Sequence, residues 1–236
     1  MKRLIKLAVI DFKLIFRDPS LRVFLVLPVI LFALIIWAVP ALVNRFEFLE
    51  PYIPLMIVVA VIENTQMFSF ISTMVLIDEK ETEVAKNYAV VPLSKFEYIV
   101  SRFLIPYLFT FLLNVILLVV QPFFSISVGV NLALSGLTAL VVPAYALGVN
   151  SIVTNRMQGM VYIKAFNMLV LIPIAAFFVP NKFQYVFGAF PTHWIFQSIR
   201  RVCLGSSATL FLLIGTLFFV VVIMWTSRQF IRKHFV

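Results

Sequence analysis

Six long apolar runs dominate this sequence and constrain its fold more than any other feature. A helix needs about 20 predominantly apolar residues to cross a bilayer, and it satisfies its own backbone hydrogen bonds in hydrocarbon. Only 12% of the residues are charged, about half the share found in a soluble domain. We therefore predict an all-α integral membrane protein, a single transmembrane domain over residues 1–236, with six transmembrane helices at about 23–43, 52–77, 103–120, 128–150, 162–179 and 207–226.

Lysine and arginine residues are divided unequally between the two sides of these spans. With the N-terminus inside, 15 of the 19 fall in inner segments, Lys164 among them, and the four outer ones are Arg45, Lys182, Arg200 and Arg201. Because cytoplasmic loops carry the excess of basic residues, we predict that both termini lie in the cytoplasm. The net charge of +9 is spread over the span ends, which argues against nucleic acid as a partner and for the lipid bilayer.

The segment before the first span, residues 1–20, is basic and helically phased. At 100° per residue, Lys6, Lys13 and Arg17 fall on one stripe and apolar residues lie roughly opposite. This pattern is typical of an amphipathic helix that lies in the membrane interface, and Pro19 then ends the helix. We predict an N-terminal amphipathic interfacial helix; a basic tail that only sets the topology is the alternative.

The segment Asp78–Arg102, between the second and third spans, holds nine charged residues. Its first half has helix-forming composition, Pro92 stops that helix, and Ser94 with Glu97 forms a capping box that starts the next one. Charged side chains are costly to place in hydrocarbon. We therefore predict a rigid cytoplasmic loop over residues 78–95 that contains a short helix.

Residues 180–206, between the fifth and sixth spans, are aromatic and contain several turn signals. Pro180 ends the fifth span, Pro191 starts a short helix that continues to Cys203, and Gly205 closes it. The stretch is too short and too interrupted to span a membrane. We predict a pair of short outer helices, re-entrant or interfacial, that dip into the outer leaflet.

Glu63, Asn64 and Gln66 place polar side chains near the middle of the second span. A carboxylate at that depth costs about 2.5–3.5 kcal/mol on insertion scales and is a functional-site candidate. Three interpretations stay open. Glu63 lines a substrate path together with Asn64 and Gln66, it forms a structural hydrogen bond between helices, or it lies nearer the outer interface.

The sequence lacks the motifs expected of an intramembrane enzyme or of an ATPase. It has no HExxH, no Cys/His metal spacing and no pair of aspartates within the spans, which are the usual carriers of such chemistry. It also has no G-x-x-x-x-G-K-[ST] motif, which cradles ATP phosphates in many ATPases. We therefore expect a non-catalytic chain that binds no cofactor or metal directly.

The order of these parts resembles the permease subunits of type-2 ATP-binding-cassette (ABC) exporters. Asp11–Pro19 resembles the family's connecting helix, and Phe190–Gly205 resembles its outer helices. The acidic run Asp78–Glu83, followed by Val91–Ser94, resembles its cytoplasmic loop. The small size and short loops are similar to those of drug, antibiotic or small-peptide export permeases, fluoroquinolone exporters among them; lipid or polysaccharide cargo is a further option.

The resemblance implies a mechanism and a set of partners. The cytoplasmic loop would be a coupling helix that docks on a separate ABC ATPase subunit, and ATP would bind to that subunit. Two permease chains, identical or different, would pair with two ATPases in a prokaryotic-type cytoplasmic membrane and export a small amphiphilic substrate. The residues that the resemblance assigns to coupling are Asp78, Glu79, Glu81, Glu83, Pro92 and Ser94.

Two other classes of function fit the same composition. A proton-coupled secondary transporter would use Glu63 and would need no ATPase, although we find no convincing inverted repeat of the kind that many such transporters have. A membrane protein without transport activity, such as a lipid-modifying enzyme, an assembly factor or an immunity protein, is the third class.

Overall fold

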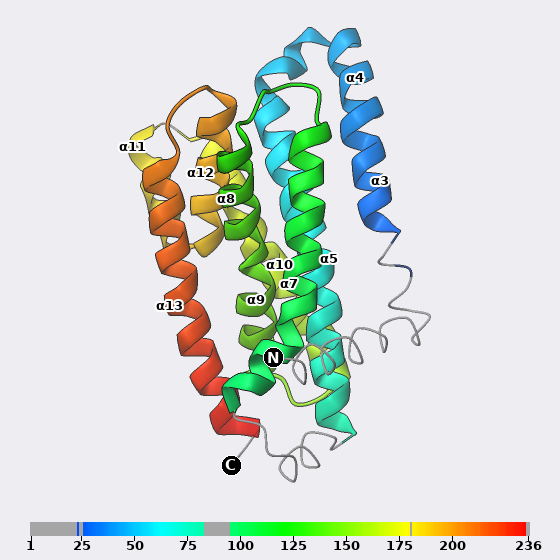
Figure 1. Ribbon diagram of the computed structural model, residues 1–236, viewed down its shortest axis with the longest axis vertical. Coiled ribbons are helices and arrows are strands. Elements are labelled where there is room, and N and C mark those ends of the chain that lie inside the picture. Colours follow the sequence, from blue (N-terminus) through cyan, green and yellow to red (C-terminus); the bar gives the residue numbers. More distant parts are fainter. Residues whose placement is uncertain (1–22, 24–25, 83–94, 180, 235–236) are drawn as a thin grey trace.

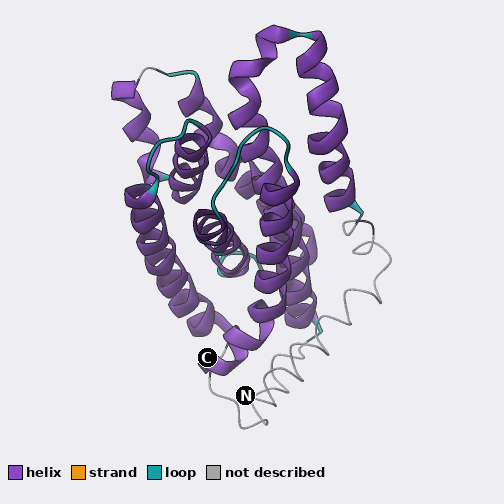
Figure 2. Ribbon diagram, turned by 45° about the horizontal axis from the view of Figure 1, so that its top comes forward, coloured by secondary structure: helices purple, strands orange, loops and turns teal. Residues whose placement is uncertain are grey.

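The structure, a computed structural model, describes residues 23, 26–82, 95–179 and 181–234. Helices dominate these residues, and none of them forms a strand (Figure 2). Six helical segments are long and apolar enough to cross a membrane, which confirms the predicted all-helical class and the number of candidate spans. Their bounds are Leu27–Arg45, Glu47–Glu81, Glu97–Val120, Val128–Asn150, Arg156–Phe177 and Thr209–Lys233.

Each span consists of one to three helical elements (Figure 1). The first two spans contain α3 (Leu27–Ala33), the π-helical η1 (Leu34–Ala38), α4 (Val39–Arg45), η2 (Glu47–Tyr52) and α5 (Ile53–Glu81). The next three contain α7 (Lys95–Val120), α8 (Val128–Ala139), α9 (Val141–Asn150), α10 (Arg156–Leu171) and η4 (Ile172–Phe177). After them come α11 (Asn181–Gln184), η5 (Tyr185–Ala189), α12 (Pro191–Cys203) and the last span, α13 (Thr209–His234).

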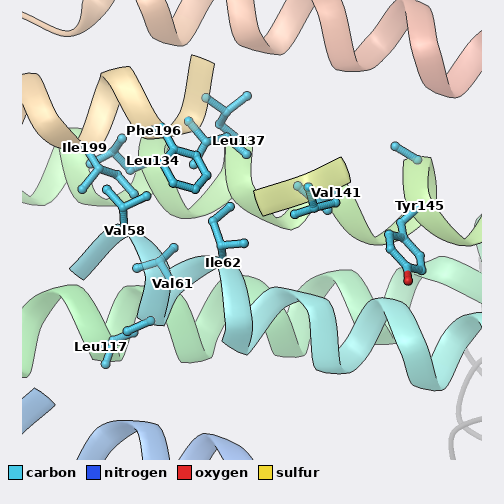
Figure 3. Close-up of a cluster of buried hydrophobic side chains, with 14 of the residues drawn as sticks. Val58, Val61, Ile62, Leu117, Leu134, Leu137, Val141, Tyr145, Phe196 and Ile199 are labelled. Carbon is cyan, nitrogen blue, oxygen red and sulfur yellow. The ribbon is translucent and has the colours of Figure 1, made fainter. Parts of the chain in front are cut away.

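The helix α5 lies at the centre of the bundle. Its sequence is apolar nearly all round, and a helix of that kind is stable when other helices surround it; here α7, α9, α10 and α12 pack against it. Figure 3 shows Val58 and Ile62 of α5 beside Phe196 and Ile199 of α12, and these four side chains have no exposed surface. By contrast, α13 exposes many large apolar side chains, as a lipid-facing helix does.

The described helices finish at two opposite ends of the bundle (Figure 1). The helices α5 and α13 finish at one end, where α7 and α10 begin, and we call it the C-terminal end. The helix α4 finishes at the other end, which also holds α11 and α12, and we call it the α12 end. The assignment of the C-terminal end to the cytoplasm stays a prediction from the basic residues.

The helix α12 has the bounds predicted from its sequence. It is followed by Gly205 with a φ of 67°, which glycine adopts without the steric penalty of a side chain. The Gly205 amide donates to the Val202 carbonyl at 3.0 Å, and the Ser206 amide donates to the Arg201 carbonyl at 2.8 Å. These two bonds form the Schellman motif that satisfies the last carbonyls of a helix. That α12 is re-entrant stays a prediction.

Two parts of the sequence are more helical than predicted. The helix α5 runs without a break to Glu81, so the loop helix expected from Asp78 starts as the last turn of α5. The helix α10 begins at Arg156, before the predicted start of the fifth span at residue 162, so Lys164, which was counted with the inner segments, lies well inside a helix. The described part of α7 begins at Lys95, and the predicted cap residue Ser94 lies outside the described residues.

Several predicted features lie outside the described residues. They are the interfacial helix, with Lys6, Lys13 and Arg17, and the loop residues Glu83, Pro92 and Ser94. Their assignments therefore stay predictions.

Candidate functional site

A cavity of about 400 Å³ lies between α3, α5 and α10, and we call it the Glu63 cavity. Glu63 and Gln66 line it from α5, and Lys164 and Asn167 line it from α10. The other lining side chains are apolar, namely Leu27, Met67, Phe70, Met160 and Ile163. Mostly apolar walls with a few polar groups are the usual composition of a small-molecule site.

Helical periodicity explains how these residues come together. The helix α5 contributes positions i, i+3, i+4 and i+7 counted from Glu63, and α10 contributes the same positions counted from Met160. Residues at that spacing share one face of a helix. Two regular helices therefore hold most of the lining groups in place, and α3 adds Leu27.

Glu63 lies far from both ends of its span. Glu50 precedes it by 13 residues and Asp78 follows it by 15, so each lies about 20 Å away along the helix at 1.5 Å per residue. The hydrocarbon core is about 30 Å thick, and this depth favours a substrate path or a structural role over a place at the outer interface. Lys164 lies eight residues into α10, about 12 Å from its start. The cavity thus holds an acidic and a basic side chain within the spans.

The protein itself satisfies the polar groups of the Glu63 cavity poorly. Within the described ranges, no ion pair involves Glu63 or Lys164. Gln66 is 5% exposed, and its Nε2 has no hydrogen-bond partner in the same part of the chain. A buried donor without a partner costs about 1–3 kcal/mol, so a ligand atom that accepts from Gln66 is favoured. No group of three or more His, Cys, Asp and Glu side chains in the described residues is placed to hold a metal ion.

Asn64 lies outside this cavity and joins α5 to α7. Its Nδ2 donates to Oδ1 of Asn114 at 2.7 Å, and Nδ2 of Asn114 donates to the Thr65 hydroxyl at 2.9 Å. None of the three residues has exposed surface. The structure therefore separates Asn64, which links two helices, from Glu63 and Gln66, which share the cavity.

Sequence reasoning missed the two polar residues that α10 contributes. Lys164 was used only as one of the basic residues that indicate the topology. Asn167 also links two helices, since the Tyr145 hydroxyl of α9 donates to its Oδ1 at 2.5 Å. The repeated spacing in α5 and α10 is the signal for the cavity, but it becomes informative only when the two helices are known to be neighbours.

A second group of polar side chains ties the last turn of α5 to α7, and we call it the Glu79 cluster. Glu79 is 7% exposed. Its Oε1 lies 2.8 Å from a guanidinium nitrogen of Arg102, and its Oε2 accepts from the Tyr98 hydroxyl at 2.9 Å. The Arg102 guanidinium also lies 5.1 Å from the centre of the Tyr98 ring, a cation–π contact. Both oxygens of this buried carboxylate are thus bound within the chain.

The same turn of α5 also binds the start of α10. Glu81 accepts from the Arg156 amide at 2.6 Å, and a carboxylate at the first residue of a helix is favoured by the helix dipole. Asp78 lies 3.5 Å from the Arg156 guanidinium, and Lys80 donates to the Val153 carbonyl at 2.6 Å. The helix α5 is therefore joined to both α7 and α10 at the C-terminal end.

These contacts bear on the coupling residues that the family resemblance implies. Asp78, Glu79 and Glu81 all bind partners within the chain. Glu79 has almost no surface left for another protein, whereas Glu81 is exposed. The contacts give these residues a part in holding helices together, and their docking on an ATPase stays a prediction.

A comparison with models of protein families matches nearly the whole chain. The model described as "Fluoroquinolones export permease protein Rv2686c-like" matches residues 11–227. That range contains the Glu63 cavity, the Glu79 cluster and α12. No match was found among the curated proteins or among the solved structures.

Proposed function

The chain belongs to the Rv2686c-like fluoroquinolone export permease family, and on this premise we propose that it is the membrane-spanning subunit of an ATP-driven ABC exporter. Family membership and six candidate spans make it a multi-pass membrane permease. The proposal adds a small amphiphilic cargo, a separate ATPase subunit that binds ATP, and a second permease chain. The Glu63 cavity is the observation that carries the proposal.

The composition of the Glu63 cavity fits a small drug with charges of both signs. Glu63 would bind a cationic amine, Lys164 an anionic group, and Gln66 a further polar atom. Phe70 and the methionines offer surface to a planar ring, because aromatic and thioether side chains pack well on such groups. The volume of about 400 Å³ lies in the range of small-molecule sites.

The contacts at the C-terminal end support the energy-coupling part of the proposal. An ATPase docked on residues 83–94 would pull on the last turn of α5. Because Glu79 binds Arg102 in α7, and Glu81 binds the start of α10, this movement would reach both neighbouring helices. The helix α10 forms one wall of the Glu63 cavity, so its displacement would reshape the cavity. In this proposal, the C-terminal end of the bundle lies in the cytoplasm, and so do both termini of the chain.

Drug uptake by inside-out membrane vesicles tests the cargo site. We expect Glu63→Gln and Glu63→Ala to lower ATP-dependent uptake of a zwitterionic fluoroquinolone about tenfold or more, because each removes a charge-assisted contact with the drug amine. The vesicles come from the native host, with its own copy replaced by each variant, so that the ATPase partner is present. Glu47→Gln is the matched control, since Glu47 is an exposed carboxylate outside the cavity. Normal uptake by both Glu63 variants at normal protein abundance would remove Glu63 from the path.

A proton-coupled secondary transporter is the second candidate, and the depth of the Glu63 carboxylate within its span favours it. The same vesicles separate the two mechanisms. Uptake that requires ATP and persists when a protonophore dissipates the proton gradient supports the ABC exporter. Uptake that persists without ATP and stops with the protonophore supports the secondary transporter.

A further inference from the structure

A second polar cavity, of about 350 Å³, lies at the α12 end, and we call it the arginine cavity. The elements α11, η5, α12 and α13 surround it, together with the turn between α12 and α13 (Figure 1). It shares no lining residue with the Glu63 cavity. Its lining residues are Gln184, Tyr185, His193, Gln197, Arg200, Arg201, Leu204, Ser206 and Phe211.

Aromatic rings and an amide hold the two guanidinium groups of this cavity. Arg200 lies 5.2 Å from the centre of the Phe177 ring, and Arg201 lies 4.4 Å from the centre of the Phe211 ring. Arg200 also donates to Oε1 of Gln184 at 3.3 Å. A guanidinium that is stacked on a ring keeps its planar set of N–H donors oriented for an anion. Two guanidinium groups, each in a defined position, therefore line the cavity.

No carboxylate of the described residues neutralises these charges. None of the chain's ten acidic residues follows Glu97 in the sequence, and no ion pair in the described ranges involves Arg200 or Arg201. Two positive charges on consecutive residues repel each other, and the repulsion is stronger where the surroundings are less polar than water. An anion between the two guanidinium groups offsets this repulsion.

His193 adds a buried polar atom that lacks a partner. The residue is 1% exposed, it lines the cavity, and its Nδ1 has no hydrogen-bond partner within the described residues. Burial lowers the pKa of His193 to about 4, so the ring is neutral at neutral pH. Buried polar atoms nearly always have a partner in native proteins. A ligand or water in the cavity would supply the missing one.

Exposed side chains with apolar surface form part of the arginine cavity, and we call them its rim. Tyr185 and Leu204 line it and are 65% and 63% exposed, and Phe183 and Val186 beside Tyr185 are exposed to a similar degree. An amphiphile with a charged head and an apolar body would contact both the arginines and this rim. A free inorganic anion would contact only the arginines.

We propose that the arginine cavity binds the phosphate of an anionic membrane lipid, with Arg200 and Arg201 as its ligands. Guanidinium groups bind phosphate oxygens in a bidentate manner. The Gln197 side chain and the His193 ring complete the polar wall of the site. The proposal depends neither on the cargo of the Glu63 cavity nor on the ATPase partner.

Fluorescence of Trp194 measures lipid binding at this site. The indole lies 5.5 Å from the His193 ring and 6.0 Å from the Phe211 ring, centre to centre, and both of those residues line the cavity. Trp37→Phe and Trp225→Phe leave Trp194 as the single tryptophan of the three. Phosphatidylglycerol with brominated acyl chains should quench it saturably in detergent, at a concentration about tenfold lower than brominated phosphatidylcholine, whose headgroup has no net charge.

Substitution of the arginines separates this site from general binding of lipid to the apolar surface. We expect Arg200→Gln with Arg201→Gln to remove the preference for phosphatidylglycerol. We expect Arg228→Gln with Arg232→Gln to keep it, since these arginines of α13 are exposed and line neither cavity. If the first double variant does not purify as folded protein, Arg201→Gln alone replaces it. Within the described residues, the Arg201 side chain makes no hydrogen bond, and it contacts the Phe211 ring. Equal quenching by the two lipids in the parent, or an unchanged preference in the Arg201 variants, overturns the proposal.

Inorganic phosphate distinguishes the two sources of the anion. If the lipid is the ligand, phosphate at matched ionic strength leaves the quenching by phosphatidylglycerol unchanged, because it lacks contacts with the apolar rim. Saturable relief of the quenching by phosphate would assign the cavity to the free anion and overturn the lipid as its occupant.

Discussion

Glu79 carries a negative charge in a place with almost no solvent, since it is 7% exposed. The desolvation of a buried carboxylate is costly, and it is offset only when good partners satisfy its oxygens. Arg102 and Tyr98 do so from α7, at 2.8 and 2.9 Å. Loss of either ionic partner would take from the other buried charge the ion pair that it makes at 2.8 Å. The Glu79 cluster therefore links α5 to α7, and its removal lowers the stability of the bundle.

Arg102→Met should destabilise the protein by about 3–5 kcal/mol, the usual effect of removing one partner of a buried ion pair. Thermal unfolding of the purified protein in detergent measures the change. Combining Glu79→Leu with Arg102→Met should cost less than the sum of the two single substitutions, because the two residues contact each other and their shared ion pair is lost only once. Asp78→Asn is the control: its ion pair with Arg156 is more than a third exposed on both sides and is worth less than about 1 kcal/mol. Equal losses for Arg102→Met and Asp78→Asn would contradict the assignment.

The two charged residues of the Glu63 cavity differ in how easily the sequence identifies them as site residues. Glu63 is conspicuous because a carboxylate within an apolar run is rare and costly. Lys164 carries a charge of the opposite sign but follows closely after a loop, so it is easily assigned to the membrane surface. Only the packing of α10 on α5 brings the two residues to one cavity. A long-range contact of this kind leaves no mark in the local sequence.

At the scale of helices, α12 and α13 approach each other closely where α13 has a glycine. A Cβ atom added at Gly215 would lie 2.9 Å from Cβ of Trp194 and 3.1 Å from a methyl carbon of Leu137. The Trp194 Cβ is fixed to its backbone and cannot move aside alone. The contact sets the position of α12 and, with it, the geometry of the arginine cavity.

Gly215→Ala should lower the stability of the protein although alanine favours helices. The better helix propensity contributes about 1 kcal/mol, whereas overpacking in a tight contact costs about 1–3 kcal/mol. Gly129→Ala is the matched control, because a Cβ atom there meets nothing within 4 Å. In thermal unfolding, we expect a lower midpoint for Gly215→Ala and no loss for Gly129→Ala. A higher midpoint for Gly215→Ala would show that α12 and α13 are farther apart than in the structure.

Local signals predicted the ends of several elements but not the contacts between them. Pro191 and Gly205 mark the bounds of α12 because proline suits the first turn of a helix and glycine its end. The end of α5 at Glu81 was not predictable in this way, since the last turn is charged and resembles a loop. Its charges are satisfied by α7 and α10, and those partners are distant in sequence.

At the scale of the whole molecule, six apolar runs were sufficient to predict the all-helical class and the number of candidate spans. Their alternation in direction places α12 at one end and the last turns of α5 and α13 at the other (Figure 1). Lys164 lies inside α10. In the described ranges, the basic residues toward the C-terminal end still outnumber those at the α12 end: Lys80, Lys95, Arg102, Arg156, Arg228, Arg232 and Lys233 against Arg45, Lys182, Arg200 and Arg201. The predicted orientation therefore keeps its support from the positive-inside rule.

Cysteine labelling in cells tests this orientation. Burial raises the pKa of the native Cys203 thiol to about 12, so at neutral pH it stays protonated and reacts slowly with maleimides, which need the thiolate. A cysteine at exposed Ser207 reports on the α12 end, and one at exposed Arg232 reports on the C-terminal end. We expect a membrane-impermeant maleimide to label Ser207→Cys in intact cells, to label Arg232→Cys only after permeabilisation, and to leave the parent chain unlabelled in both. The reverse pattern would place the last turn of α5 outside the cell, where no ATP-driven partner operates, and would overturn the coupling proposal.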